Sequence, residues 1–343
     1  MLKNEINTIT PFECAQQTQL LTVLVPVYNE ADGIQKFHDR LEAALAQICV
    51  SGIEIIYIND GSIDNSVYWL KKIALADARV QLIDLSRNFG KEAAMTAGIN
   101  RAKGDAVIII DADLQDPPEL IPEMVKQWQQ GFDVVNMRRI SRAGESFFKK
   151  KTAQMFYRLM SQMGPVKMPE NVGDFRLLSR GAVEALKQMP ERNRFMKGMF
   201  AWIGFPVKEI LYHRDPRFAG ETKWNYWSLL NLAVEGITSY TVTPLRLSTY
   251  LGLFVSLSTF GYGLFILLRT IVYGDPVQGF PTLIIAMLFL GGLQLLAIGI
   301  AGEYIGRIFL ESKKRPLYIV KNTFERSSVS LPRSNPKPHR RVL

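Results

Sequence analysis

Cysteine and histidine are both scarce in this chain of 343 residues. The two cysteines do not form a CxxC pair, and the three histidines lie far apart in the sequence. Two cysteines are too few for a framework of disulfides, and the lack of a Cys or His cluster argues against a zinc site. These residues are Cys14, Cys49, His38, His213 and His339.

Two kinds of motif are also missing. Residues 1–19 are polar and lack the apolar core of a signal peptide, so we expect an N-terminal extension before a domain that stays in the cytoplasm. The chain contains neither G-x-x-x-x-G-K-[ST] nor G-x-G-x-x-G. This argues against P-loop and dinucleotide-binding enzymes.

Positive charge is in excess, with 41 Lys and Arg against 32 Asp and Glu and a formal net charge of +9. Nucleic acid and an anionic membrane surface would both attract such a chain. The position of the charge decides between them. Residues 303–343 carry ten basic residues and three glutamates directly after two long apolar runs, which favours a membrane and no nucleic acid.

Short apolar runs alternate with segments of helical length in the first part of the chain. The helical segments include 33–50 and 64–77, and the apolar runs are rich in Val and Ile. This alternation predicts an α/β domain with a mainly parallel sheet and helices on both faces. The runs are 20–27, 53–60, 80–86, 105–111 and 133–137.

The two long apolar runs predict a membrane hairpin. Residues 247–268 and 276–302 contain no charged side chain, and each run exceeds the roughly 20 residues that cross a bilayer. We expect transmembrane helices at 247–268 and 279–302, joined by a short turn. The basic residues after 303 place both termini in the cytoplasm, with 303–343 a partly disordered basic tail.

Two further segments are expected at the membrane surface. Residues 145–163 combine aromatic and Met side chains with Lys149 to Lys151, the pattern of a basic amphipathic helix. A helix packed on the domain would have the same pattern, but the apolar runs that follow favour an interfacial position. We place the α/β domain at 20–225 and a second, juxtamembrane amphipathic helix at 226–243.

An acidic motif, DADLQDPPE at 111–119, stands where the fourth predicted strand ends. In open parallel sheets, ligands bind at the carboxyl ends of the strands. In an extended segment Asp111 and Asp113 would point the same way, as hard oxygen ligands for Mg²⁺ or Mn²⁺ bound to a diphosphate. A capped turn with solvated acids would contain the same residues.

Other polar groups follow neighbouring strands. PVYNE (26–30) ends the first predicted strand, and Asp60 directly follows the second, where it would bond a nucleotide base or ribose or cap a turn. Basic residues that would neutralise phosphate gather downstream, although solvated surface charges would look the same. They are Arg87, Lys91, Arg138, Arg139, Arg217 and Lys223.

The ordered motifs resemble those of one enzyme family. PVYNE, NDGSID, RNFGK, DADLQDPPE, GDFRLLSR, ERNRFMKGMFAW and AGETKW occur in the order seen in family 2 polyprenyl-phosphate glycosyltransferases of the GT-A (Rossmann-like) fold. The chain is most similar to bactoprenol (undecaprenyl-phosphate) glucosyltransferases of O-antigen modification, and more distantly to dolichyl-phosphate mannose synthases. The resemblance covers roughly residues 20 to 320.

The resemblance implies roles for individual residues. Asp111, Asp113 and Gln115 would bind the metal, and Asp174 would act as a base or orient the acceptor phosphate. The nucleotide-sugar site would comprise Pro26, Tyr28, Glu30, Asp60, Arg87, Lys91, Asp111, Ala112 and Asp113. The acceptor-phosphate site would comprise Arg138, Arg139, Arg176, Arg217 and Lys223. Asn59 and Thr222 depart from the family's usual Asp and Ser, which could alter the sugar preference.

The resemblance also implies a reaction and a setting. We expect inverting transfer of glucose from UDP-glucose to undecaprenyl phosphate, by a multi-pass homotetramer in the bacterial inner membrane. The product would be a lipid-linked sugar donor for O-antigen or another envelope glycan. Mannose, GlcNAc or an aminoarabinose derivative could replace glucose, and a non-catalytic nucleotide-sugar-binding protein is the alternative from another class. The chain has no Q-x-x-R-W motif of a processive synthase and too few spans for a flippase.

Overall fold

The computed structural model describes six stretches of the chain. The predicted helix at 145–163 and all but the last residue of the one at 226–243 lie outside them, as do Arg217, Lys223 and nearly all of the N-terminal extension. The described residues are 19–140, 172–189, 191–192, 194–214, 243–273 and 279–325.

An eight-stranded sheet forms the centre of the domain, in the order β7-β5-β6-β4-β1-β2-β3-β8. Strand β1 pairs in parallel with β2 and β4, and β2 with β3, so the predicted parallel arrangement is confirmed. The strands are β1 (Leu20–Val27), β2 (Gly52–Asn59), β3 (Val80–Leu85), β4 (Ala106–Ile109), β5 (Val134–Arg139), β6 (Val172–Ser179), β7 (Val207–Tyr212) and β8 (Val320–Glu325).

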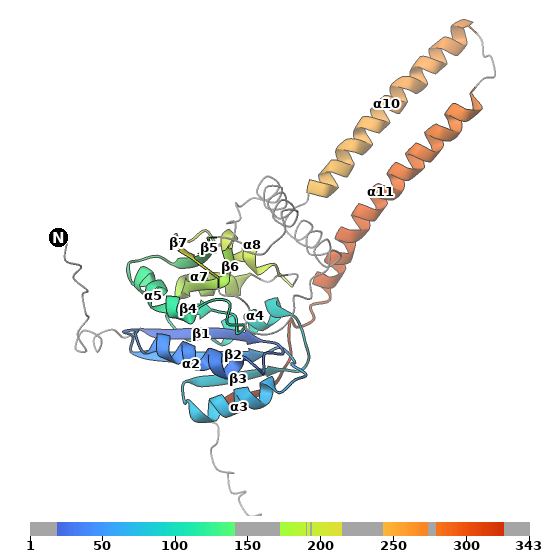
Figure 1. The fold of residues 1–343 in the computed structure, drawn as a ribbon. Helices are drawn as coiled ribbons and strands as arrows, with labels where there is room; N and C mark the ends of the chain where they lie inside the picture. The colour runs from blue at the N-terminus through green and yellow to red at the C-terminus, as the bar shows by residue number, and fades with distance from the viewer. Residues whose placement is uncertain are drawn as a thin grey trace, which may run out of the picture.

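Helices cover both faces of this sheet (Figure 1). Helices α2, α3 and α5 enclose one apolar core, and α4, α7 and α8 enclose the other. The 3-10 turn η1 (Pro118–Leu120) leads into α5, as the Asp-Pro-Pro sequence predicts. The helices are α2 (Ile34–Leu45), α3 (Ser66–Ala76), α4 (Lys91–Arg101), α5 (Ile121–Gln129), α7 (Arg180–Gln188) and α8 (Met196–Trp202).

The unbroken apolar runs have their reason in these two cores. Along β1, Val23 and Val25 point into the first core while Leu24 between them points into the second. All three side chains are fully buried, and burying each contributes roughly 1.5–3 kcal/mol of hydrophobic free energy. In a strand with water on one face, apolar and polar residues would alternate along the sequence instead.

Two antiparallel strands complete the sheet, and neither was predicted. Strand β6 pairs with both β4 and β5, and β8 pairs with β3 at the sheet edge. The sequence placed the start of a basic tail at residue 303. The structure differs, because the preceding helix continues to Ser312 and Val320–Glu325 belongs to the catalytic sheet.

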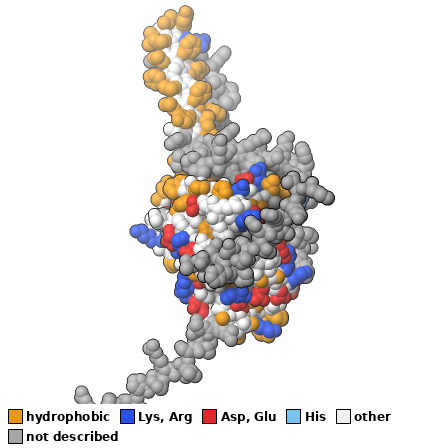
Figure 2. Space-filling model, turned by 90° about the vertical axis from the view of Figure 1, so that its left-hand side faces the viewer, with side chains coloured by type: hydrophobic (Ala, Val, Ile, Leu, Met, Phe, Trp, Pro, Cys, Tyr) orange, Lys and Arg blue, Asp and Glu red, His pale blue; other side chains and the backbone are white. Residues whose placement is uncertain are grey.

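Two long helices, α10 (Thr243–Tyr273) and α11 (Phe280–Ser312), lie side by side and project away from the sheet (Figure 1). Apolar side chains dominate this arm, while acidic and basic side chains cover much of the globular part (Figure 2). Among the described residues, one segment, Phe289–Ser312, is apolar and long enough to cross a membrane. The membrane hairpin therefore stays a prediction.

A glycine at the end of β2 lets two loops touch. Gly61 has a φ of 66°, and a Cβ placed there would lie 2.3 Å from the carbonyl carbon of Arg87. Backbone atoms cannot give way as a flexible side chain can. We expect Gly61→Ala to destabilise the protein by about 2–3 kcal/mol, seen as a lower unfolding temperature in far-UV circular dichroism of the detergent-solubilised chain.

Gly131 offers a matched control, since its φ is also positive, at 100°, but no atom lies within 4 Å of the Cβ position. Gly131→Ala adds backbone strain without a clash, so its cost should be only about 1 kcal/mol. Equal losses in the two variants would contradict the role assigned to loop contact at Gly61.

Candidate active site

A cavity of about 420 Å³ opens at the carboxyl ends of the parallel strands. Nine residues predicted for the nucleotide and metal sites line it: Pro26, Tyr28, Glu30, Asp60, Lys91, Asp111, Ala112, Asp113 and Gln115. Sequence reasoning missed five other lining residues: Val27, Asn88, Gly90, Ala94 and Arg214. The parallel sheet thus brings together four motifs that lie far apart in the sequence.

The loop after β1 is held by the loop after β2. Asn29 adopts a φ of 56°, and its side-chain oxygen accepts a hydrogen bond of 2.9 Å from the Ile63 amide. In return, the hydroxyl of Ser62 accepts from the Asn29 amide at 3.0 Å, and that of Ser66 accepts from the Glu30 amide at 2.9 Å. These bonds set the backbone that presents Tyr28 and Glu30 to the cavity.

Asp60 fixes a third loop. Its two carboxylate oxygens accept hydrogen bonds from the amides of Phe89 (2.8 Å) and Gly90 (3.0 Å). Burial raises the pKa of Asp60 above its ordinary value, although these two bonds act against the rise. Asp60 therefore shapes the cavity wall besides lining it.

Asn59, a departure from the family pattern, has a structural explanation. Its side-chain amide donates a hydrogen bond of 2.7 Å to Asp84 on the neighbouring strand, and both residues are buried. An aspartate at position 59 would bring two buried carboxylates together, which costs free energy unless one is protonated. Asn59 thus has a structural partner in Asp84, and its effect on the sugar preference stays a prediction.

The DADLQ segment is a loop and not an extended strand. Strand β4 ends at Ile109, and Leu114 has a φ of 60°. The Gln115 amide donates to Asp113 at 3.1 Å. Asp111 and Asp113 nevertheless both line the cavity, because the turn brings them to one wall.

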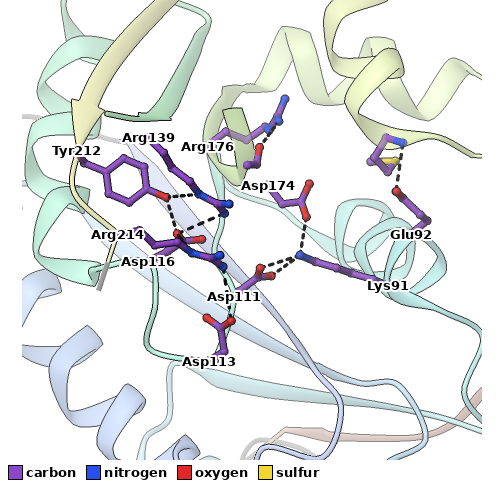
Figure 3. Close-up of polar contacts among 12 residues, drawn as sticks. Lys91, Glu92, Asp111, Asp113, Asp116, Arg139, Asp174, Arg176, Tyr212 and Arg214 are labelled. Carbon is purple, nitrogen blue, oxygen red and sulfur yellow. Dashed lines mark hydrogen bonds and ion pairs between the residues drawn. The ribbon is translucent and has the colours of Figure 1, made fainter. Parts of the chain in front are cut away.

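Asp174, on the antiparallel strand β6, does not line the cavity but contacts Lys91, which does. Ile109 of β4 pairs with Arg176 of β6, and extending that register by two residues sets Asp111 opposite Asp174. The ammonium of Lys91 lies between them, 2.7 Å from Asp111 and 2.5 Å from Asp174 (Figure 3). One lysine thus links residues 111–115, the predicted metal loop, to Asp174, the residue predicted to orient the acceptor phosphate.

The contacts of Lys91 with Asp111 and Asp174 shift the pKa values of Asp174 and Lys91. Burial alone would raise the pKa of Asp174, but the charges of Lys91, Lys197 and Arg176 outweigh it and hold the pKa below its ordinary value. Burial likewise opposes the charge on Lys91, yet Asp111 and Asp174 raise its pKa. At neutral pH Asp174 is a carboxylate and Lys91 is a cation.

Three predicted phosphate-binding arginines contact protein groups and do not line the cavity. Arg138 pairs with Glu209 at 3.0 Å. Arg139 donates to the Tyr212 hydroxyl at 3.2 Å. Arg176 is buried, stacks 3.8 Å above the Phe200 ring and donates to the Gly173 carbonyl; its burial lowers its pKa to about 10. Arg87 lies over the Phe89 ring at 4.2 Å, also outside the lining.

Asp116, beyond the metal loop, gathers a second group of charges (Figure 3). It is fully buried and accepts a hydrogen bond of 2.5 Å from Tyr212. Arg139 lies 3.8 Å and Arg214 lies 3.7 Å from the same carboxylate oxygen. Nothing in the sequence pattern marked Arg214, because its position depends on Asp116 and on the end of β7.

The donor set at the cavity fits a divalent metal. Asp111, Asp113 and Gln115 offer carboxylate and amide oxygens, the ligands that Mg²⁺ and Mn²⁺ prefer. Among the described residues a second group, His38, Glu42 and Asp77, also has metal-ligand atoms close together. There the guanidinium of Arg79 already pairs with Glu42 at 2.6 Å and Asp77 at 2.7 Å, so we assign it a structural role.

Comparison with known proteins identifies the family of this chain. Residues 22–187 match the family described as Glycosyl transferase family 2. The chain is 49% identical to an uncharacterized glycosyltransferase of Synechocystis, over 88% of this chain and 94% of that protein. It is 47% identical to the bactoprenol glucosyl transferase of Shigella phage SfV, over 88% and 98% of the two chains.

A further relative is the prophage bactoprenol glucosyl transferase homolog of Escherichia coli K12, 46% identical over 88% of this chain and 98% of that one. Among solved structures, glucosyl-3-phosphoglycerate synthase from Mycobacterium tuberculosis is 17% identical, with a TM-score of 0.45 over 67% of this chain and 82% of that chain.

The GT-A-like sheet and its acidic cavity define an enzyme of the glycosyltransferase class. The chain belongs to glycosyl transferase family 2.

Glu92, next to Lys91, generates a pH prediction. Burial and the charge of Asp174 raise the pKa of Glu92 from 4.5 to about 7. The folded state therefore binds this proton more tightly than the unfolded state, so its contribution to stability is lost as pH rises through about 7. We expect Glu92→Gln to reduce the fall in unfolding temperature between about pH 5 and pH 8.

Glu123→Gln is the control, since Glu123 is exposed on α5. It should keep the pH dependence of the unmodified protein. An unchanged pH dependence in Glu92→Gln, measured by the same thermal unfolding, would show that Glu92 is already ionised in the folded state.

Proposed function

We propose that this glycosyltransferase moves glucose from UDP-glucose to a polyprenyl phosphate, with undecaprenyl phosphate as the acceptor in the cell. One observation carries the proposal: relatives named bactoprenol glucosyl transferase are 46–47% identical to this chain over 98% or more of their own length. The cavity and the apolar arm both suit a reaction between a nucleotide sugar and a lipid phosphate.

The donor would lie in the cavity with its base near the ends of β1 and β2. The ring of Tyr28 is 45% exposed and lines the cavity, so it can stack on a base. Glu30 and Asp60 lie beside it and can accept hydrogen bonds from the base or ribose. Asp111, Asp113 and Gln115 would then hold a divalent cation against the diphosphate.

That cation, Mg²⁺ or Mn²⁺, would supply positive charge to the departing diphosphate. The protein residues provide the rest of the chemistry. A lipid phosphate is already ionised at neutral pH, so Asp174 need not remove a proton. Asp174 instead keeps Lys91 beside the metal loop, where its ammonium can neutralise phosphate oxygens on either substrate.

The reaction is a single inverting displacement. An oxygen of the lipid phosphate attacks the anomeric carbon, the bond from that carbon to the diphosphate breaks, and UDP leaves with the electron pair. Lys91 and the predicted phosphate-binding residues Arg217 and Lys223 would hold the two anionic reactants together against their repulsion.

The setting follows from the acceptor. A lipid-linked product stays in the bilayer, so we propose an enzyme of the bacterial inner membrane, anchored by α10 and α11 as a two-span hairpin. The catalytic domain and both termini would face the cytoplasm, where nucleotide sugars are made. The homotetramer stays a prediction of the family resemblance.

A transfer assay tests the proposal. Purified chain in detergent is incubated with undecaprenyl phosphate, Mg²⁺ and radiolabelled UDP-glucose, and label is counted in the organic phase. Asp113→Asn should lower transfer by about 100-fold or more, because a metal ligand loses its charge. Asp39→Asn, on the exposed face of α2, should transfer at the original rate.

Each other outcome has a meaning. Label from another nucleotide sugar but not from UDP-glucose would change the sugar and keep the enzyme class. Binding of UDP-glucose with no transfer from any donor would favour the non-catalytic binding protein.

A further inference from the structure

Two basic side chains form ion pairs with the two carboxylates of the predicted metal loop (Figure 3). The ammonium of Lys91 lies 2.7 Å from Asp111, and the Nη2 of Arg214 lies 3.7 Å from Asp113. Both cations line the same cavity as the carboxylates. The loop that we expect to bind a divalent cation is thus neutralised by side chains.

Each cation also has a second carboxylate partner. Lys91 contacts Asp174 at 2.5 Å, and the Nε of Arg214 lies 3.7 Å from Asp116. Asp116 is itself held by the hydroxyl of Tyr212. A cation that leaves Asp111 or Asp113 therefore remains paired, which lowers the cost of its movement.

Arg214 is held only loosely by Asp113. A distance of 3.7 Å to Asp113 is an ion pair without a hydrogen bond. Within the part of the chain that the structure describes, its Nε has no hydrogen-bond partner either. A planar guanidinium in this state can turn toward phosphate oxygens, which it binds with two parallel hydrogen bonds.

These charges make metal and donor dependent on each other. A divalent cation that binds the loop alone meets the repulsion of Lys91 and Arg214 at short range, with no diphosphate for them to contact. A diphosphate that arrives with the metal offers new partners to both side chains. The same two cations therefore oppose the metal alone and assist the metal together with the donor.

We propose that Lys91 and Arg214 hold the place of the divalent cation on Asp111 and Asp113, and transfer to the diphosphate when a nucleoside diphosphate sugar binds with its metal. This inference rests on the proposed function only in the class of donor. It assigns Arg214 to diphosphate binding, with Asp116 and Tyr212 as its positioning residues.

The proposal predicts two effects of opposite sign for one substitution. Arg214→Gln should bind Mn²⁺ about 10-fold more tightly than the unmodified protein when no nucleotide is present, because one repulsive charge is gone. With Mn²⁺ saturating, the same variant should bind UDP about 10- to 100-fold more weakly, because a guanidinium–phosphate contact is lost. A merely structural defect would weaken both.

The measurements use the full chain in detergent. Free Mn²⁺ is counted by electron paramagnetic resonance during a titration without nucleotide, and UDP binding is measured by calorimetry at saturating Mn²⁺. Lys91→Gln should also tighten Mn²⁺ binding. Arg214→Lys keeps the charge, so its Mn²⁺ affinity should stay near the original value while its UDP affinity falls part of the way.

Arg101→Gln is the matched control. It removes the same charge from an arginine that pairs with Glu325 at 2.7 Å and does not line the cavity. Its Mn²⁺ and UDP affinities should both equal those of the unmodified chain. Thermal unfolding of every variant checks that the protein is folded. Tyr212→Phe keeps the ring against Phe175 and should weaken UDP binding, because Asp116, which positions Arg214, loses a hydrogen bond.

Two results would overturn the inference. One is a folded Arg214→Gln and a folded Lys91→Gln that bind Mn²⁺ no more tightly than the original protein. The other is Arg214→Gln with undiminished UDP affinity. The Mn²⁺ titration contains no sugar and no lipid, so it does not depend on the proposed reaction. If the variants bind Mn²⁺ more tightly but the unmodified protein transfers no sugar, the proposed function is contradicted and the inference about Lys91 and Arg214 still holds.

Discussion

The charged bridge from Asp111 through Lys91 to Asp174 is the interaction on which the cavity depends. It joins the end of a parallel strand, the start of a helix and an antiparallel strand at one point. Without the lysine, the carboxylates of Asp111, just after β4, and Asp174, on β6, would repel each other across a partly buried space. The bridge therefore stabilises the ligand-free site and keeps the Lys91 ammonium where we propose that donor and acceptor phosphates meet.

The parallel half of the fold was predictable from the sequence. Runs such as LLTVLVPV bury residues on both faces, so their unbroken apolar character predicts a covered parallel sheet, and β1 occupies residues 20–27 as expected. Because ligands bind at the carboxyl ends of parallel strands, we expected Tyr28, Asp60 and Asp111 in one site, and all three line the cavity. Local pattern and site agree here because each motif directly follows its own strand.

The remaining features depend on contacts that no local pattern shows. Strand β8 follows a long apolar helix, and its edge position is set by pairing with β3 across more than two hundred residues. Arg139 and Arg176 resembled phosphate ligands in sequence, yet one contacts Tyr212 and Asp116 and the other is buried on Phe200. Arg214 lines the cavity, where it forms an ion pair with the buried carboxylate of Asp116.

A structure of the full chain with UDP and Mn²⁺ tests the central claim most directly, namely that the Asp111–Lys91–Asp174 bridge marks where metal, donor and acceptor meet. We expect metal density at about 2.1 Å from carboxylate oxygens of Asp111 and Asp113, with the Lys91 ammonium moved from Asp111 to the diphosphate and still beside Asp174. Metal bound elsewhere, or Lys91 still bridging Asp111 and Asp174 with the nucleotide in place, would contradict the claim.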